Sequence, residues 1–464
     1  MEVKPFKAFR FDADVVGDVG SCIAPPYDVI NSSLQRQLYK KSKYNIVRII
    51  RAKTNASDNA DDNQYTRAAD YLKSWIERGV LKQDLTESIY AYIQDFEVGD
   101  SAYQRLSFIA LAKIEELGPA IRDHEEILTE PAIDRLNLTR ATKAQFGLPF
   151  CLYEDEQQLT EEIIEGHIKE ESLIDFYDMS NHFHREEHSD QEPSKASYHL
   201  ATATKPRNEI RHRLFAITDK GKIDAIIRMI LNKTCIIADG HHRYATALNY
   251  SKETDNPAAK FQMMAFTNAR HGGLVILATH RLVGGLDNFA LDKLINELKT
   301  DFEISQYSFD SLQNRNSAKL KMLEQLKAAH GCHDIAFGVY GGNKTLYTAK
   351  LENEQAIERI APEMSRASQS VDVSVLHKLI LGKYLGIGEE QVAGGHYIEY
   401  VKDADNSIDE SIAKVDAGHK QLAFFVNPVR IQQLKQVTEA GEKMPQKSTY
   451  FFPKIYTGLT INKL

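Results

Sequence analysis

The sequence is poor in cysteine, with four in 464 residues: Cys22, Cys151, Cys235 and Cys332. They lie far apart, and no two form the C-x-x-C pair that is typical of zinc sites and redox dithiols. The pattern therefore indicates neither of these sites. We expect the four thiols to be core residues of a protein in a reducing compartment.

Long apolar runs are also missing. No stretch of about 18 apolar residues occurs, which is the length that a transmembrane helix requires. The first residues, MEVKPFKAFRFDADVV, lack the basic region and apolar run of a signal peptide. We therefore expect a cytoplasmic protein without a membrane partner.

The chain has no excess of positive charge, since its formal net charge is -8. Proteins that hold duplex DNA through its phosphates usually carry a basic face, and no helix-turn-helix pattern is evident here, so there is no strong nucleic-acid signal. A composition of 42% hydrophobic and 26% charged residues is typical of soluble globular proteins, and the length allows two or three domains.

The order of apolar patterns predicts a mixed α/β fold in three regions, 1–105, 106–287 and 288–464. Period-2 runs at 88–98 and 103–114, joined by GDSA, predict a β-hairpin, and PFCLYED predicts a strand. A polar start and Pro131 precede a helical pattern that contains IDRLNL. Polar segments at 54–64 and 181–208 predict loops, and we interpret His182, His184 and His188 as loop residues and not as metal ligands.

A strand, helix, strand order follows the second polar segment. HRLFAITD and KTCIIADG predict strands and KIDAIIRMILN predicts an amphipathic helix between them. The second strand ends at Gly240 and opens directly into HHRYATALNYSKE, so a βα corner is expected there. Two further strands are predicted by FQMMAFTNA and GLVILATHRLV.

The βα corner has the residue types of a phosphate site. A helix N-terminus presents unpaired N–H groups and a partial positive charge, and Gly240 lets a backbone come close to a ligand. Arg243 can bind an anion through two donors, His241 and His242 can donate hydrogen bonds or carry a proton, and Asp239 can hold Mg²⁺. The structural alternative is that Asp239 caps the helix while Arg243 pairs with a carboxylate.

The sequence contains neither GxxxxGK[ST] nor a kinase-type glycine loop, so those two nucleotide folds are excluded. The chain instead resembles a widespread, largely uncharacterised prokaryotic family, a domain of unknown function. The resemblance rests on APPYDVI (24–30), HEEILTEPAIDR (124–135), ADGHHRYATAL (238–248), THRLV (279–283) and MPQKSTYFFPK (444–454).

The box ADGHHRYATAL also resembles the phosphate-binding corner of the ParB/sulfiredoxin superfamily, in the form found in archaeal free-serine kinases. This resemblance implies a ParB/sulfiredoxin-like nucleotide-binding core with large insertions and flanking α/β regions. It implies ATP or ADP as the cofactor, with phosphates bound by Gly240, His241, His242 and Arg243. His241 stands where sulfiredoxins have their reactive cysteine, so that chemistry is not expected.

The same kinases carry a histidine–glutamate pair and a helical arginine upstream of the box, which correspond here to His124, Glu125 and Arg135. The resemblance implies that Glu125 is the catalytic base, that Arg135 contacts the nucleotide, and that Asp239 and His241 complete the catalytic set. The alternative for Glu125 is an acidic residue in the first turn of a helix, where it favours the dipole.

Further candidates for substrate binding are Tyr27 and Asp28, which follow two stiffening prolines, His280 and Arg281 in THRLV, and Lys447 in the terminal motif. A rigid turn and a paired surface arginine are the structural alternatives. Asp372 and His377 are expected to be structural.

Three functions remain open from the sequence. The first is a Mg²⁺- and nucleotide-dependent kinase of a small hydroxylated metabolite, such as free serine. The second is a non-catalytic nucleotide switch of the ParB type, and the third is a hydrolase of phosphate esters.

Overall fold

The computed structural model describes residues 1–125, 129–179, 209–403 and 406–464. The expected loop at 181–208, with its three histidines, lies outside these residues. Contacts divide the chain into unit 1 (1–122, 127–274 and 453–464) and unit 2 (123–126 and 275–452). The expected division into three regions stays a prediction.

Unit 1 is built on a mixed sheet. Within the described residues, nine strands pair in the order β6-β11-β8-β12-β5-β4-β10-β9, with β1 on the edge of β5. β11 pairs parallel with β6 and β12 with β8, and the remaining pairs are antiparallel. The strands are β1 (Val3–Lys4), β4 (Ile89–Val98), β5 (Ser101–Lys113), β6 (Ile121–Arg122), β8 (Phe150–Tyr153), β9 (Ile174–Met179), β10 (Glu209–Ile217), β11 (Cys235–Asp239) and β12 (Phe261–Asn268).

The apolar patterns predicted most of this sheet. The hairpin is confirmed as β4 and β5, and the strands expected at 149–155, 212–219, 233–240 and 261–269 are confirmed as β8, β10, β11 and β12. The core beneath it joins apolar residues of these strands to Ile223, Ile226 and Ile230, which recur at helical spacing on α7 (Lys220–Leu231).

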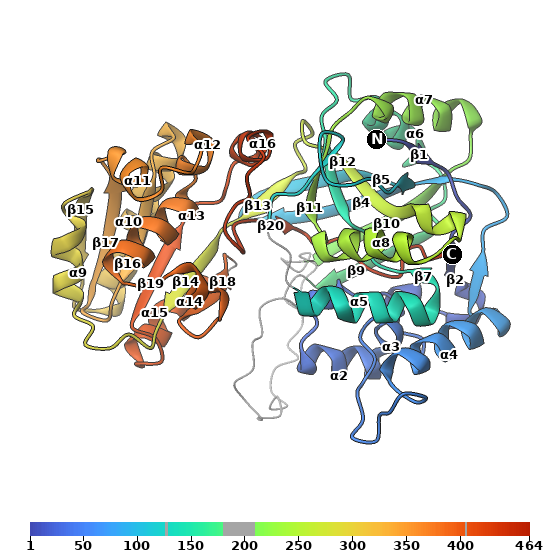
Figure 1. Cartoon of the computed structure of the whole chain (residues 1–464), viewed down its shortest axis with the longest axis horizontal. Coiled ribbons are helices and arrows are strands. Elements are labelled where there is room, and N and C mark those ends of the chain that lie inside the picture. The colour runs from blue at the N-terminus through green and yellow to red at the C-terminus, as the bar shows by residue number, and fades with distance from the viewer. Residues whose placement is uncertain (126–128, 180–208, 404–405) are drawn as a thin grey trace, which may run out of the picture. The chain divides into compact units, whose positions relative to one another are not determined.

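Helices of unit 1 position the βα corner. α8 (His241–Glu253) lies beside α5 (Thr129–Thr142), and α5 lies beside α4 (Gln64–Glu77) (Figure 1). Asn63 and Thr66 form a capping box that starts α4. The other α-helices are α1 (Ala13–Val16), α2 (Ser32–Lys41), α3 (Val47–Ile50) and α6 (Leu159–His167), and short 3₁₀ helices are η1 (Val19–Ser21), η2 (Tyr27–Val29) and η4 (Pro257–Lys260). Two-stranded sheets are formed by β2 (Phe9–Phe11) with β3 (Leu81–Gln83) and by β7 (Ala144–Gln145) with β21 (Asn462–Lys463).

Unit 2 is built on an antiparallel sheet with apolar side chains on both faces. On β19, Leu422, Phe424 and Val426 belong to one core cluster, while Ala423 and Phe425 belong to another. This period of two means that helices must cover both faces. In the described residues the order is β15 (Phe302–Ser308), β17 (Thr345–Leu351), β16 (Ala336–Tyr340), β19 (Leu422–Val426), β14 (Thr279–Val283) and β18 (Ile398–Lys402).

The prediction of one continuous strand at GLVILATHRLV is wrong. GLVILATHRLV forms two strands: β13 (Val275–Leu277), which pairs with β20 (Tyr450–Phe452), and β14, which enters the six-stranded sheet. An apolar period does not reveal which partner each half will find. The helices of unit 2 are α9 (Leu291–Leu298), α10 (Leu312–Cys332), α11 (Gln355–Ile360), α12 (Arg366–Gln369), α13 (Asp372–Val375), the π-helix η5 (Leu376–Tyr384), α14 (Glu389–Ala393), α15 (Ser407–Asp416) and α16 (Ile431–Glu439).

The expected mixed α/β class is confirmed. Among the helices that the structure describes, none combines the length and the apolar content needed to cross a membrane.

Candidate functional site

The βα corner in unit 1 forms where the strand-to-helix pattern predicted it. β11 ends at Asp239, Gly240 has a left-handed φ of 86°, and α8 begins at His241. A Cβ at position 240 would lie 3.0 Å from the Arg243 guanidinium and 3.0 Å from Cα of Pro149. Glycine is therefore required by backbone conformation and by the packing of Arg243, which occupies the space over it.

Asp239 is held between two cations. Nζ of Lys454 lies 3.1 Å from Oδ1, and Nη2 of Arg243 lies 3.0 Å from Oδ2. Burial alone would raise the pKa of Asp239, but the charges of Lys454 and Arg243 outweigh it and hold that pKa well below its usual range, and His241 adds to the lowering. The alternative that Asp239 caps α8 is wrong, because the N-cap is Gly240 and has no side-chain hydrogen bond.

Arg243 is a buried cation that donates two hydrogen bonds to protein groups. Its Nη1 donates to the Leu148 carbonyl at 2.6 Å, its Nη2 donates to Asp239, and Asp28 lies 3.9 Å away. Burial opposes the charge, but Asp239 and Asp28 outweigh it and raise the pKa of Arg243. The alternative that Arg243 pairs with a carboxylate is confirmed. These two hydrogen bonds use two of the five N–H donors that a guanidinium offers.

Arg135 on α5 supplies a second cation. Its guanidinium lies 4.0 Å from the centre of the Tyr27 ring, and Nη1 donates to the Ile50 carbonyl at 2.7 Å. Nε donates to Asp134 at 3.0 Å. Burial raises the pKa of Tyr27 to about 12, so its hydroxyl stays protonated at neutral pH. Arg135 is thus fixed by a ring, a carbonyl and a carboxylate.

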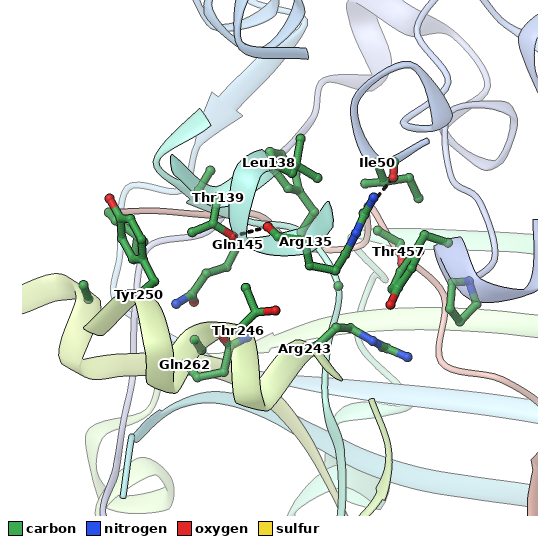
Figure 2. A pocket seen from close by; sticks show the side chains of 18 residues that line it. Ile50, Arg135, Leu138, Thr139, Gln145, Arg243, Thr246, Tyr250, Gln262 and Thr457 are labelled. Atoms are coloured by element: carbon green, nitrogen blue, oxygen red, sulfur yellow. Dashed lines mark hydrogen bonds between the residues drawn. The ribbon is translucent and has the colours of Figure 1, made fainter. Parts of the chain in front are cut away.

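Arg135 and Arg243 line one pocket. Figure 2 shows the two side chains, one from α5 and one from α8, with Arg135 directed to the Ile50 carbonyl. The pocket volume of about 60 Å³ is well below the roughly 300–1,000 Å³ of pockets that enclose whole drug-sized ligands. It can therefore enclose only part of a nucleotide. The other lining residues are Pro26, Tyr27, Ile50, Leu138, Thr139, Ala144, Gln145, Phe146, Gly147, Thr246, Ala247, Tyr250, Ala259, Gln262, Thr457 and Leu464.

The histidines of the corner differ in exposure. His241 is buried at the start of α8, whereas His242 is half-buried. Of the residues expected to bind substrate, Tyr27 lines the pocket and Asp28 is exposed beside Arg243. The structure thus brings the candidate residues of unit 1 together around α5 and α8.

The other candidates gather in unit 2. Oε1 of Glu125 accepts the backbone N–H of Lys447 at 2.9 Å, and Glu125 also forms a parallel bridge with Met444. Glu125 precedes α5, which begins at Thr129, so the alternative that it belongs to a first helical turn is wrong. The HEE motif and the terminal motif therefore meet, although no pattern in the sequence indicated their pairing.

His280 and Arg281 are buried in β14. Nε2 of His280 lies 3.4 Å from Asp403, and Nη2 of Arg281 donates to the Lys447 carbonyl at 3.1 Å. The alternative of a surface arginine is wrong, because Arg281 is fully buried. The period-2 pattern of THRLV did not reveal this burial, since helices cover both faces of the sheet.

A protein-built Mg²⁺ site does not fit the corner. Both oxygens of Asp239 already contact cations, which would repel a metal ion. The residues that the structure describes include no cluster of three His, Cys, Asp or Glu side chains able to hold a metal. The expected role of Asp239 as a metal ligand is therefore not supported by its surroundings.

Sequence reasoning missed Lys454 and Arg105. Lys454 ends the terminal motif, and Arg105 on β5 is fully buried and donates to Gln94 and to the Pro453 carbonyl. The sequence FFPK places Lys454 directly after apolar residues, and this pattern could have indicated a buried lysine. Arg105 gave no signal beyond a charge inside an apolar strand.

Comparison with known proteins identifies a family. The family described as "Protein of unknown function (DUF1015)" matches residues 3–194 and 186–374. No curated protein matches the chain.

Solved structures that match the chain include a free serine kinase variant in complex with AMP, at 10% identity and a TM-score of 0.33, covering 72% of this chain and 84% of that one. A second variant of that kinase in complex with ADP has 11% identity and a TM-score of 0.32, with the same coverage. C-terminally truncated SbnI from Staphylococcus aureus has 8% identity and a TM-score of 0.32, covering 76% and 87%. Similarity at this level carries no activity over to this chain.

Proposed function

We propose that this chain, which belongs to the DUF1015 family of proteins of unknown function, is a nucleotide-dependent phosphotransferase that acts on a small hydroxylated metabolite. The nucleotide is ATP or ADP, and its phosphates bind in the pocket between α5 and α8. The metabolite is a compound such as free serine.

One observation carries the proposal: two arginines from the neighbouring helices α5 and α8 line one small pocket, and one of them, Arg243, lies in the first turn of α8. Arg135 and Arg243 are held in place by other groups, so little side-chain entropy is lost when an anion binds. Guanidinium groups bind phosphate oxygens through paired donors. The small volume of the pocket suits a phosphate better than a base.

In the proposed reaction, the metabolite hydroxyl oxygen attacks the terminal phosphorus and the bond to the bridging oxygen of the nucleotide breaks. The hydroxyl proton passes to Glu125, and the shortened nucleotide leaves with the bridging oxygen. Arg135 and Arg243 stabilise the charge on the phosphate oxygens. The meeting of Glu125 with the corner of unit 1 stays a prediction.

A non-catalytic nucleotide switch is the second candidate. It is favoured by the ion pairs of Asp239 with Lys454 and Arg243. These charges lower the pKa of Asp239, so this carboxyl group carries no proton near neutral pH and cannot act as an acid. A switch needs the same binding pocket but no base.

Calorimetric titration with ATP, ADP and AMP tests the binding step. Arg135→Ala should weaken binding about tenfold or more, as expected for a lost charge-assisted hydrogen bond. Arg140→Ala is the matched control, because Arg140 lies on the same helix but is exposed and pairs with Glu253. Equal affinity in the wild type and Arg135→Ala would contradict the site, whereas tight binding without phosphate transfer to any hydroxylated acceptor would favour the switch.

A further inference from the structure

A second candidate site lies in unit 2, around the buried cation Arg281. Arg281 on β14 is 0% exposed, and its guanidinium donates to the backbone carbonyls of Thr279 and Lys447. In the described part of the chain, no carboxylate lies within ion-pair distance of it, and its Nε is buried without a hydrogen-bond partner. Burial lowers the pKa of Arg281 to about 10, and the more distant charge of Glu125 opposes that change, so the guanidinium is charged at neutral pH.

Two further polar atoms near Arg281 are also buried and unpartnered among the described residues: Oη of Tyr400 and Nε2 of His377. Tyr400 on β18 is the cross-strand neighbour of Arg281, and the guanidinium lies 5.4 Å from the centre of its ring. His377 belongs to the π-helix η5, close enough to Arg281 for the positive charge to reinforce the lowering of its pKa that burial causes, to about 3. His377 is therefore a neutral imidazole.

Buried polar groups of this kind lower the stability of the fold when no ligand is bound to them. A buried charge without a close counter-charge and buried donors without acceptors each destabilise a fold, and native structures contain few of them. π-helical segments are rare and often occur at functional sites. The three groups come from three different elements of unit 2, β14, η5 and β18, and not from one local turn.

The three groups share one chemistry. Arg281 Nε and Tyr400 Oη are donors, and a neutral imidazole donates through one nitrogen. A ligand that accepts several hydrogen bonds and carries negative charge satisfies all of them at once. We propose that Arg281, His377 and Tyr400 bind the oxyanion group, a carboxylate or a phosphate, of a small metabolite. This site does not rest on nucleotide binding in unit 1.

Lys447 makes two backbone hydrogen bonds in this region. Its carbonyl accepts from Arg281 and its N–H donates to Glu125, so this residue joins the proposed oxyanion site to the carboxylate of Glu125.

The test is calorimetric titration of the full chain with sodium acetate and with inorganic phosphate, at constant ionic strength in chloride. One of the two should bind saturably, which identifies the source of the oxyanion. Tyr400→Phe should weaken that binding about tenfold, the loss expected for one hydrogen bond to a charged group. Because Oη has no partner in the described residues, the same variant should melt at or above the wild-type temperature.

Three further variants show whether the anion binds at Arg281, His377 and Tyr400 or at another place on the chain. Tyr397→Phe removes the same hydroxyl from a half-buried tyrosine nearby and should bind as the wild type does. His377→Gln should weaken binding as Tyr400→Phe does. Arg243→Ala removes the phosphate site proposed in unit 1, so oxyanion binding that survives in it belongs elsewhere. Absence of saturable binding of both anions, or equal affinity in the wild type, Tyr400→Phe and His377→Gln, would overturn the proposal.

Discussion

Lys454 donates to Asp239 across 3.1 Å, although 215 positions separate the two residues in the sequence. The lysine side chain is 8% exposed and the aspartate side chain 17%, so the pair is largely shielded from water. The terminal segment thereby neutralises the corner that the ADGHHRYATAL motif builds, and it does so together with Arg243.

Lys454→Met should destabilise the protein by about 3 kcal/mol, because removing one partner of a buried pair leaves its charge poorly compensated. Lys113→Met is the matched control: its pair with Glu2 is half exposed and should contribute less than about 1 kcal/mol. Urea denaturation of both variants measures the difference. Equal stability of the two would show that Lys454 is not a structural partner of Asp239.

The low pKa of Asp239 predicts an acid dependence of stability. The carboxyl titrates at a lower pH in the folded chain than in the unfolded chain, where its pKa is about 3.9. Its contribution is therefore present above about pH 4 and is lost as the pH falls below that value. Asp239→Asn, which carries no charge at any pH, should be less stable at neutral pH and should lose less stability between about pH 4 and pH 2. Parallel acid curves for the two proteins would contradict this.

Gly240→Ala should destabilise the protein through strain and through contact. The substitution places a Cβ at a φ of 86° and 3.0 Å from the Arg243 guanidinium, so Arg243 must move. Gly17→Ala is a matched control, because Gly17 has a φ of 75° but nothing within 4 Å of the added Cβ. Backbone strain should lower the free energy of unfolding of both variants by about 1–3 kcal/mol, measured by urea denaturation. Gly240→Ala should lose additional stability through its contacts and should bind nucleotide less tightly. A nucleotide affinity unchanged by Gly240→Ala would separate this glycine from the pocket.

The local part of the candidate site could be predicted from the sequence. The apolar run that ends at Asp239, the glycine and the helical spacing after it determine a strand, a turn and a helix within 20 residues. The partners of these residues could not be predicted, because Lys454 and the Leu148 carbonyl reach the corner through long-range packing. The same limit applies to Arg281, whose burial depends on helices that cover both faces of its sheet.

Glu125→Gln should lower the rate of phosphate transfer by about 10²–10⁴, because glutamine keeps the shape of the side chain but accepts no proton. The amide oxygen can still accept the Lys447 N–H, so the fold of unit 2 should be preserved. Nucleotide affinity should stay unchanged, since the phosphates bind to Arg135 and Arg243. Steady-state assays with ATP or ADP and a set of hydroxylated acceptors measure the effect, and full activity in this variant would exclude Glu125 as the base.

The central claim is that nucleotide phosphates bind between Arg135 and Arg243 at the start of α8. A crystal structure of the chain grown with ADP tests it most directly. We predict phosphate oxygens within about 3.2 Å of both guanidinium groups. We also predict the Glu125 carboxylate within about 12 Å of Asp239, a distance that leaves room for a substrate beyond the direct reach of a base. Nucleotide bound elsewhere, with Arg135 and Arg243 still occupied by their protein partners alone, would contradict the claim.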